Sequence, residues 1–285
     1  MPRSKLKMKN KKIIKRSIIC WLLLMPFIIM SLFPYAVMLT SSLKPRGEVY
    51  KIPTSWFASD FRFKNYLEMW DAINFGSSLF NSLYVGFITT LCILIIAIPA
   101  AYGLSQFEFK YKGLYRMFLL TTQMLSPIIL IIGIFRLCVW LGILDSKNSL
   151  VLVYAAFGLA FSTWMLQSYF STIPKELEES AWIEGATKFK SLIYIFIPLA
   201  IPAITVTSLI SFVHSWNEFV LALTLMRSNE NYTLPLKVFS LVGGRYQIEW
   251  DHVMAATFLA TVPVAIIFSW LQKYLVQGIS LGAIK

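Results

Sequence analysis

The sequence predicts an all-α, polytopic membrane protein with six transmembrane helices. Hydrophobic residues make up 57% of the 285 residues and charged residues only 14%, and the mean hydropathy is +0.66. Soluble domains carry about 45–50% apolar and about 25% charged residues. Six stretches are also long and apolar enough to cross a bilayer. These observations exclude a water-soluble enzyme, a disordered tail and a disulfide scaffold.

A helix needs about 20 apolar residues to cross the hydrocarbon layer, and a spanning segment must be helical because lipid cannot satisfy open backbone groups. The first stretch follows a basic segment, as a signal peptide would. It is too long for one and has no A-x-A cleavage site, so we interpret it as an uncleaved helix. The six stretches are Ser17 to Leu43, Ala72 to Phe107 (one span near Leu79–Leu104), Met117 to Phe135, Asn148 to Pro174, Ser191 to Asn217 and His252 to Gln272.

The distribution of basic residues predicts the orientation. The N-terminus, two of the loops and the tail carry 16 Lys and Arg, against 9 in the connections on the other side. Cytoplasmic segments are enriched in these residues, so we expect both termini in the cytoplasm of a multi-pass protein of the cell membrane. The predicted parts are a basic cytoplasmic N-terminus (1–16), a first helix (17–43), an outer loop (44–77), a five-helix core (78–272) and a cytoplasmic tail (273–285).

The outer loop 44–77 mixes aromatic side chains with charges of both signs. One interpretation is an aromatic belt at the level of the lipid headgroups. The other is a docking platform for a partner outside the cell. Both remain open at this point.

The inner loop 171–193 breaks the charge pattern. It carries four acids, whereas the other inner connections hold only Glu108. Acids contribute little to membrane insertion, and an anionic leaflet repels them. A basic protein partner on the cytoplasmic side would explain them, and the alternative is a solvated acidic connector.

Local signals predict a short helix in this loop. Pro174 suits a first helical position, Glu176 in the first turn is favoured by the helix dipole, and Gly185 allows a turn with positive φ. Ser180, Ala181 and their small neighbours would let a partner's backbone approach closely.

The segment Ile173 to Ala186, followed by Ile197-Pro198-Leu199 and Pro202, resembles the EAA loop of permease subunits of ATP-binding cassette importers. Glu179-Ser180-Ala181 occupies the E-A-A positions, with Ser for the middle Ala. Glu184-Gly185 occupies the Asp-Gly positions, with Glu for Asp.

Further matches cover nearly the whole chain and indicate the carbohydrate-uptake branch, similar to the smaller permease of the maltose transporter. They are Asn81-Ser82, Trp216-Asn217-Glu218-Phe219, Thr233-Leu234-Pro235, Gln272-Lys273-Tyr274, Gly278 and Gly282-Ala283-Ile284-Lys285.

The resemblance implies the type I importer permease fold and a loop helix that seats in a cleft of a separate ATPase. The sequence has no G-x-x-x-x-G-K-[ST] phosphate loop, so we expect a non-catalytic subunit without its own cofactor, whose partner binds ATP and Mg²⁺. Glu178, Glu179 and Glu184 would be its ionic contacts. The implied coupling residues are Glu176, Glu178, Glu179, Ser180, Ala181, Glu184, Gly185 and Ala186.

The resemblance also implies a second, homologous permease, an ATPase dimer and an extracytoplasmic solute-binding protein as partners, and no nucleic acid. An oligosaccharide is the first expectation for the substrate; glycerol phosphate or a polyol is the alternative. Polar residues near the membrane runs are candidates for the substrate pathway, with helix–helix hydrogen bonding as the other interpretation. These candidates are Gln123, His214, Trp216, Asn217 and Glu218.

Two other classes stay open. An ion-coupled secondary transporter would need a titratable site near the membrane midplane, and Glu218 comes closest to one. A non-transporting scaffold or sensor would leave the acidic loop unexplained. We find no metal-ligand cluster and no arrangement typical of nucleophilic catalysis; Cys20, Cys92 and Cys138 lie in or beside apolar runs.

Overall fold

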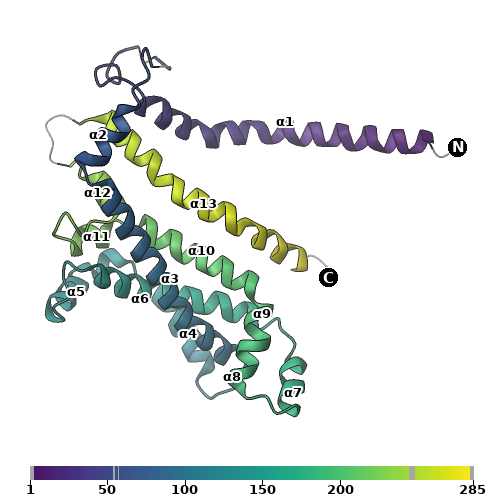
Figure 1. Ribbon diagram of the computed structural model, residues 1–285. Coiled ribbons are helices and arrows are strands. Elements are labelled where there is room, and N and C mark those ends of the chain that lie inside the picture. Colours follow the sequence, from purple (N-terminus) through teal and green to yellow (C-terminus); the bar gives the residue numbers. More distant parts are fainter. Residues whose placement is uncertain (1–2, 54, 57, 244–247, 283–285) are drawn as a thin grey trace. The chain divides into compact units, whose positions relative to one another are not determined.

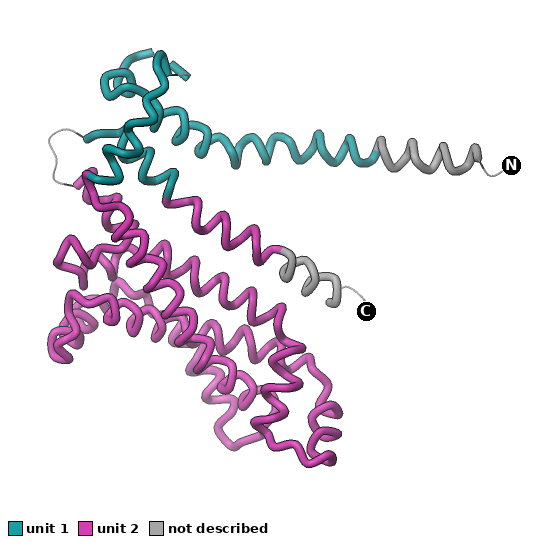
Figure 2. The backbone as a smooth tube through the Cα atoms, viewed as in Figure 1, with its two compact units in different colours: residues 1–71, 245–259 teal, residues 72–244, 260–285 magenta. Residues whose placement is uncertain are grey.

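The computed structural model describes residues 3–53, 55–56, 58–243 and 248–282, with side chains from residue 16 to residue 272 (Figure 1). The regular elements of these residues are all helical, as predicted. The chain divides into two compact units, residues 1–71 with 245–259, and residues 72–244 with 260–285 (Figure 2).

The first unit contains α1 (Arg3–Ser42), most of α2 (Lys64–Ala72) and the start of α13 (Trp250–Gly282). Helix α1 begins well before the predicted span, within the basic segment. The expected outer loop contributes turns and then the short helix α2. Exposed Arg46 joins these parts, because its guanidinium lies 3.0 Å from Glu249 and 3.6 Å from the buried Asp251.

The second unit is built on α3 (Phe75–Gln106), α6 (Lys147–Phe170) and α10 (Ile201–Asn217). Glycines let these helices approach closely, as is common in membrane bundles. A Cβ at Gly86 of α3 would lie 2.8 Å from the Phe212 ring of α10, and a Cβ at Gly158 of α6 would lie 2.6 Å from Ile93 of α3. Gly86 thus lies at the contact of α3 with α10, and Gly158 lies at the contact of α6 with α3.

Two of the six predicted spans are not single straight helices. The predicted span Met117 to Phe135 corresponds to α4 (Lys112–Gln123) and α5 (Pro127–Trp140), which meet at 95°. Residues before a proline are restricted away from the helical region, so Pro127 separates the two helices. The described residues therefore hold four helices long and apolar enough to cross a membrane, or up to six if each bent pair is one span.

The second break lies in the predicted span Ser191 to Asn217. Here α8 (Lys188–Ser191), a π-helical turn (Leu192–Phe196) and α9 (Ile197–Leu199) precede α10 at an angle of 79°. Pro198 and Pro202 each begin a helical segment, since a proline suits the first turn but interrupts a helix interior. The remaining elements are α7 (Lys175–Ile183), α11 (Val220–Leu225) and α12 (Leu234–Phe239).

Candidate functional site

Helix α7 and the turn that ends it form the predicted loop helix. The helix begins one residue later than expected, with Pro174 as its N-cap, and Glu176 and Glu178 lie in its first turn. The helix ends at Ile183. The chain then turns at Gly185, whose φ of +85° is left-handed, and the Ala186 N–H donates to the Ala181 carbonyl at 2.9 Å. Such a turn favours glycine because it has no Cβ, so the structure confirms the predicted helix and turn.

The face that α7 presents to solvent is acidic and contains small residues. Figure 1 shows α7 and α8 together at one end of the second unit, which we call the α7 end. The half-buried members of the predicted set are Ala181 and Ala186, and the exposed ones are Glu176, Glu179, Ser180, Glu184 and Gly185.

Glu178 differs from the expectation of an outward ionic contact. It is only 3% exposed, and its carboxylate accepts the hydroxyl hydrogen of Tyr102, near the end of α3. Burying a carboxylate is costly unless it is hydrogen-bonded, which explains this pairing. Glu178 therefore fastens α7 to the helical core, while Glu179 and Glu184 point outward.

Aromatic contacts complete this attachment. The Tyr102 ring packs edge-on against Phe107 and Phe196, with centroids 5.4 Å and 5.0 Å apart. The Lys188 ammonium lies 4.3 Å from the Phe107 centroid and 5.9 Å from that of Trp182 in α7. A displacement of α7 would thus reach the end of α3 and the broken helix that leads into α10.

A hydrogen-bond network joins separate segments at the opposite end of the second unit. The buried Asn81 side chain of α3 donates to the carbonyls of Glu230 and Tyr232, at 2.7 Å and 3.1 Å. The hydroxyl of Ser82 accepts the Leu234 N–H at 2.7 Å. Two of the motifs recognised in the sequence, Asn81-Ser82 and Thr233-Leu234-Pro235, therefore meet in space.

Asp145 is a second centre of this network and was not identified from the sequence. Its carboxylate accepts the backbone N–H groups of Arg227 and Ser228, at 2.8 Å and 3.0 Å, and the Ser228 hydroxyl. Desolvation raises the pKa of Asp145, but these hydrogen bonds outweigh it and hold the pKa below its ordinary value. Asp145 thus fixes the loop before α6 to the loop after α11.

Replacing Asn81 by alanine is expected to destabilise this end. Two carbonyls would lose their donor, which costs about 1–3 kcal/mol when the groups stay buried. For a chain of this size, at about 2–4 °C per kcal/mol, we expect the unfolding midpoint in detergent to fall by about 2–12 °C. Asn148→Ala is the control, because among the described residues this exposed side chain accepts the Tyr84 hydroxyl and no other donor. An equal loss in both variants would contradict the prediction.

The candidates for the substrate pathway do not form one cluster. Gln123, His214 and Asn217 are exposed, whereas Trp216 is 4% exposed and stacks on Phe212 with centroids 5.7 Å apart. The Trp216 indole therefore lies in the core of this chain, whereas the neighbouring Asn217 is exposed.

Glu218 has a structural role that the sequence did not indicate. Its carboxylate accepts the Tyr154 hydroxyl at 2.5 Å and the N–H groups of Leu221 and Ala222 at 2.8 Å and 3.1 Å. These are the free donors at the start of α11, which a carboxylate satisfies well.

Residues 93–281 match the family model described as "Binding-protein-dependent transport system inner membrane component". The chain belongs to this family. It is therefore a multi-pass membrane protein.

Curated relatives and a solved structure can be aligned with nearly the whole of this chain. The probable ABC transporter permease YurM of Bacillus subtilis is 30% identical over 93% of this chain and 87% of its own length. The trehalose/maltose transport permease MalG of Thermococcus litoralis is 34% identical over 90% of this chain and 92% of its own length. The crystal structure of a bacterial alginate importer has a TM-score of 0.77 at 23% identity, over 90% of this chain and 95% of that one. This last likeness shows the shared fold.

Proposed function

We propose that the chain is the transmembrane subunit of an ATP-driven importer for a carbohydrate, with an oligosaccharide as the leading substrate. The observation that carries the proposal is α7, an exposed acidic helix fastened to the membrane bundle through Glu178 and Tyr102. The printed names of the relatives, which include trehalose/maltose and diacetylchitobiose uptake permeases, support the substrate class.

Helix α7 would seat in a cleft of a separate ATPase dimer, which binds ATP and Mg²⁺ and drives the motion. Exposed Glu179 and Glu184 would meet basic side chains there, and the small residues beside them would allow close contact. Because Glu178 ties α7 to α3, a displacement of the helix would pass into the spans. This chain then acts as a non-catalytic subunit.

The complete importer would contain a second, homologous permease and an extracytoplasmic solute-binding protein. One solved relative, an alginate importer, was crystallised with its periplasmic protein bound to a pentasaccharide. Exposed aromatic residues of the outer loop, including Trp56 and Phe63, would contribute to receptor docking. Both termini would lie in the cytoplasm, as the distribution of basic residues favours.

The exposed polar residues Gln123, His214 and Asn217 are the remaining candidates for the substrate pathway, facing the other permease rather than this chain's core. Glycerol phosphate or a polyol is the alternative substrate class. An ion-coupled mechanism is less supported, because Glu218, the acid nearest to a suitable position, is used as a helix cap.

Charge reversal on the outward face of α7 tests the proposal. Glu179→Lys is expected to lower ATP-dependent uptake at least about thirtyfold, because it turns an ionic contact into a repulsion worth several kcal/mol at an interface. The readouts are uptake into vesicles and the amount of ATPase that co-purifies with the subunit. Glu230→Lys, which reverses an exposed acid at the opposite end, should retain the ATPase. Wild-type uptake and ATPase recovery in Glu179→Lys would refute the proposal.

A further inference from the structure

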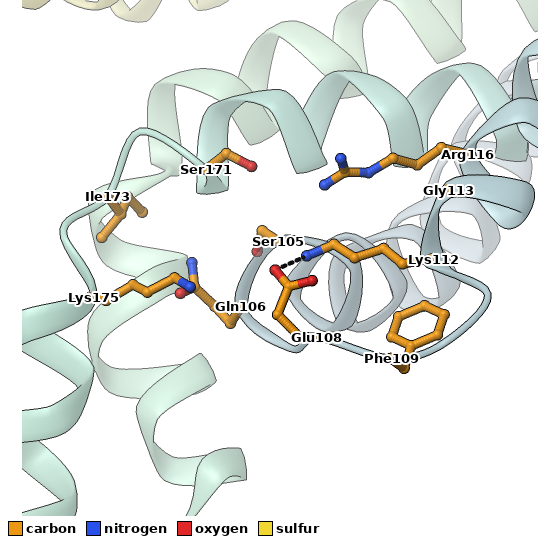
Figure 3. Close-up of a pocket in the computed structure, with 10 residues that line it drawn as sticks. All are labelled: Ser105, Gln106, Glu108, Phe109, Lys112, Gly113, Arg116, Ser171, Ile173 and Lys175. Carbon is orange, nitrogen blue, oxygen red and sulfur yellow. Dashed lines mark hydrogen bonds and ion pairs between the residues drawn. The ribbon is translucent and has the colours of Figure 1, made fainter.

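A cavity of about 550 Å³ lies beside the first turn of α7, at the α7 end of the second unit (Figure 3). Three separate segments form its walls: the end of α3 with the loop that follows it, the start of α4, and the connection from α6 to α7. The side chains that matter for its chemistry are Gln106, Glu108, Phe109, Lys112, Arg116 and Lys175.

The cavity carries an excess of positive charge. Lys112, Arg116 and Lys175 contribute three cations, whereas Glu108 is the one carboxylate among the lining residues. The Lys112 ammonium lies 2.8 Å from the Glu108 carboxylate (Figure 3). The hydrogen bond and charge of Lys112 hold the pKa of Glu108 below its ordinary value, with the charges of Lys175 and Arg116 adding to the effect. One carboxylate thus lies near three basic side chains, and the cavity keeps an excess of positive charge.

The ion pair between Lys112 and Glu108 does not neutralise the charge of the cavity. The side chain of Lys112 is 11% exposed and that of Glu108 is 77% exposed, so the buried cation is paired with an anion that stands largely in solvent. Burying a charge without a close, shielded counter-charge is costly. A second anion inside the cavity would lower that cost, and it would also meet Arg116 and Lys175.

Two buried polar atoms in the walls lack a hydrogen-bond partner among the described residues. They are Nε of Arg116, a donor, and Oε1 of Gln106, an acceptor. Their side chains are already placed, because Arg116 donates to the Leu104 carbonyl at 3.2 Å and Gln106 donates to the Phe170 carbonyl at 3.2 Å. A ligand with both anionic oxygens and a hydroxyl group would satisfy the two atoms together.

The surroundings favour a lipid over a soluble anion. Helix α4, which supplies Lys112 and Arg116, exposes Leu114, Met117 and Phe118 with 66%, 67% and 60% of their surface accessible. Phe109 at the cavity is 46% exposed. Basic pockets next to apolar helix faces are a known way to hold acidic lipid headgroups, since acyl chains can lie along the helix.

We propose that this cavity binds the headgroup of an anionic phospholipid, with the phosphate between Arg116 and Lys175 and a headgroup hydroxyl on Gln106. The headgroup connects α4 to the first turn of α7. This site is separate from the contact with an ATPase proposed above, and it holds whether or not that function is correct.

The test measures lipid retained by the purified full-length chain, in complex with its partners, in nanodiscs of phosphatidylcholine with a minor fraction of phosphatidylglycerol. Bound phosphatidylglycerol is quantified by mass spectrometry after detergent extraction. Lys175→Gln and Arg116→Gln are each expected to lower its enrichment about fivefold, as befits one basic residue near an anionic headgroup. Glu108→Gln is expected to raise the enrichment of phosphatidylglycerol. Lys175 is exposed, so its variant remains informative if Arg116→Gln fails to fold.

Lys110→Gln is the matched control, because this exposed lysine lies in the same loop and does not line the cavity. Enrichment that falls in the two lining variants and persists in the control supports the proposal. Inorganic phosphate that displaces the lipid at millimolar concentration would show that a free anion suffices and would overturn the lipid assignment. Equal enrichment in all variants would overturn the site itself. If the two lining variants lose the co-purifying ATPase but keep the wild-type enrichment of phosphatidylglycerol, the cavity is a protein-docking surface. That result would also overturn the proposal.

Discussion

Gly185→Asp is expected to abolish ATP-driven uptake while the subunit remains in the membrane. The backbone at Gly185 has φ +85°, and a Cβ there would meet no atom of the described residues within 4 Å, its chain neighbours aside. The substitution therefore strains the turn by about 1–2 kcal/mol without a clash in the fold. It also places a carboxylate beside Glu184, on the face proposed to meet the ATPase. Desolvating an unpaired charge at an interface costs about 2–5 kcal/mol, so uptake should fall at least about thirtyfold.

The chain offers a matched control at another turn. Gly142 also has positive φ, +67°, and open space around its Cβ position, but it lies between α5 and α6, away from α7. Gly142→Asp imposes the same kind of backbone strain and the same added charge. Vesicle uptake and membrane content are measured for both variants. Equal loss of uptake in both, or none in Gly185→Asp, would contradict the assignment of the α7 turn to coupling.

Composition and apolar run lengths were sufficient to predict the all-helical membrane class, because a spanning segment leaves the backbone few alternatives. The continuity of each span could not be predicted in the same way. Pro127 and Pro202, which follow the two bends, are visible in the sequence, but prolines are tolerated inside membrane helices: Pro99 lies within unbroken α3. Which prolines break a helix depends on the packing of its neighbours, and a single sequence does not contain that information.

The candidate site shows the same division between local and long-range information. Local chemistry predicted α7 and its glycine turn, since N-terminal acids and a left-handed glycine are signals within ten residues. The hydrogen-bond partner of Glu178 could not be predicted from the sequence. Tyr102 is separated from it by 76 positions, and it resembles any aromatic residue at the end of a span. Likewise, Glu218 reads as a functional acid in the sequence, whereas its contacts with Tyr154 and the start of α11 exist only in the fold.

Tyr102→Phe is expected to separate ATPase binding from transport. The variant removes the hydroxyl that Glu178 accepts and leaves a carboxylate that is 3% exposed without this donor. Hydrogen bonds to charged groups contribute about 1.5–3 kcal/mol, so α7 should loosen from α3 and uptake should fall at least about tenfold. The outward acid Glu179 is untouched, and the amount of co-purifying ATPase should therefore equal that of the wild type.

A second variant distinguishes the lost attachment from general damage. In Tyr102→Phe/Glu178→Leu both partners become apolar, and replacing both sides of a buried hydrogen bond is far less costly than removing one. The double variant should therefore recover part of the thermal stability that Tyr102→Phe loses, and uptake should stay low because the polar tie is gone. Tyr84→Phe, which removes an exposed hydrogen bond of 2.9 Å to Asn148, is the control and should transport normally. Normal uptake in Tyr102→Phe, or a loss of ATPase as large as that in Glu179→Lys, would show that this pair does not carry motion from α7 into the membrane.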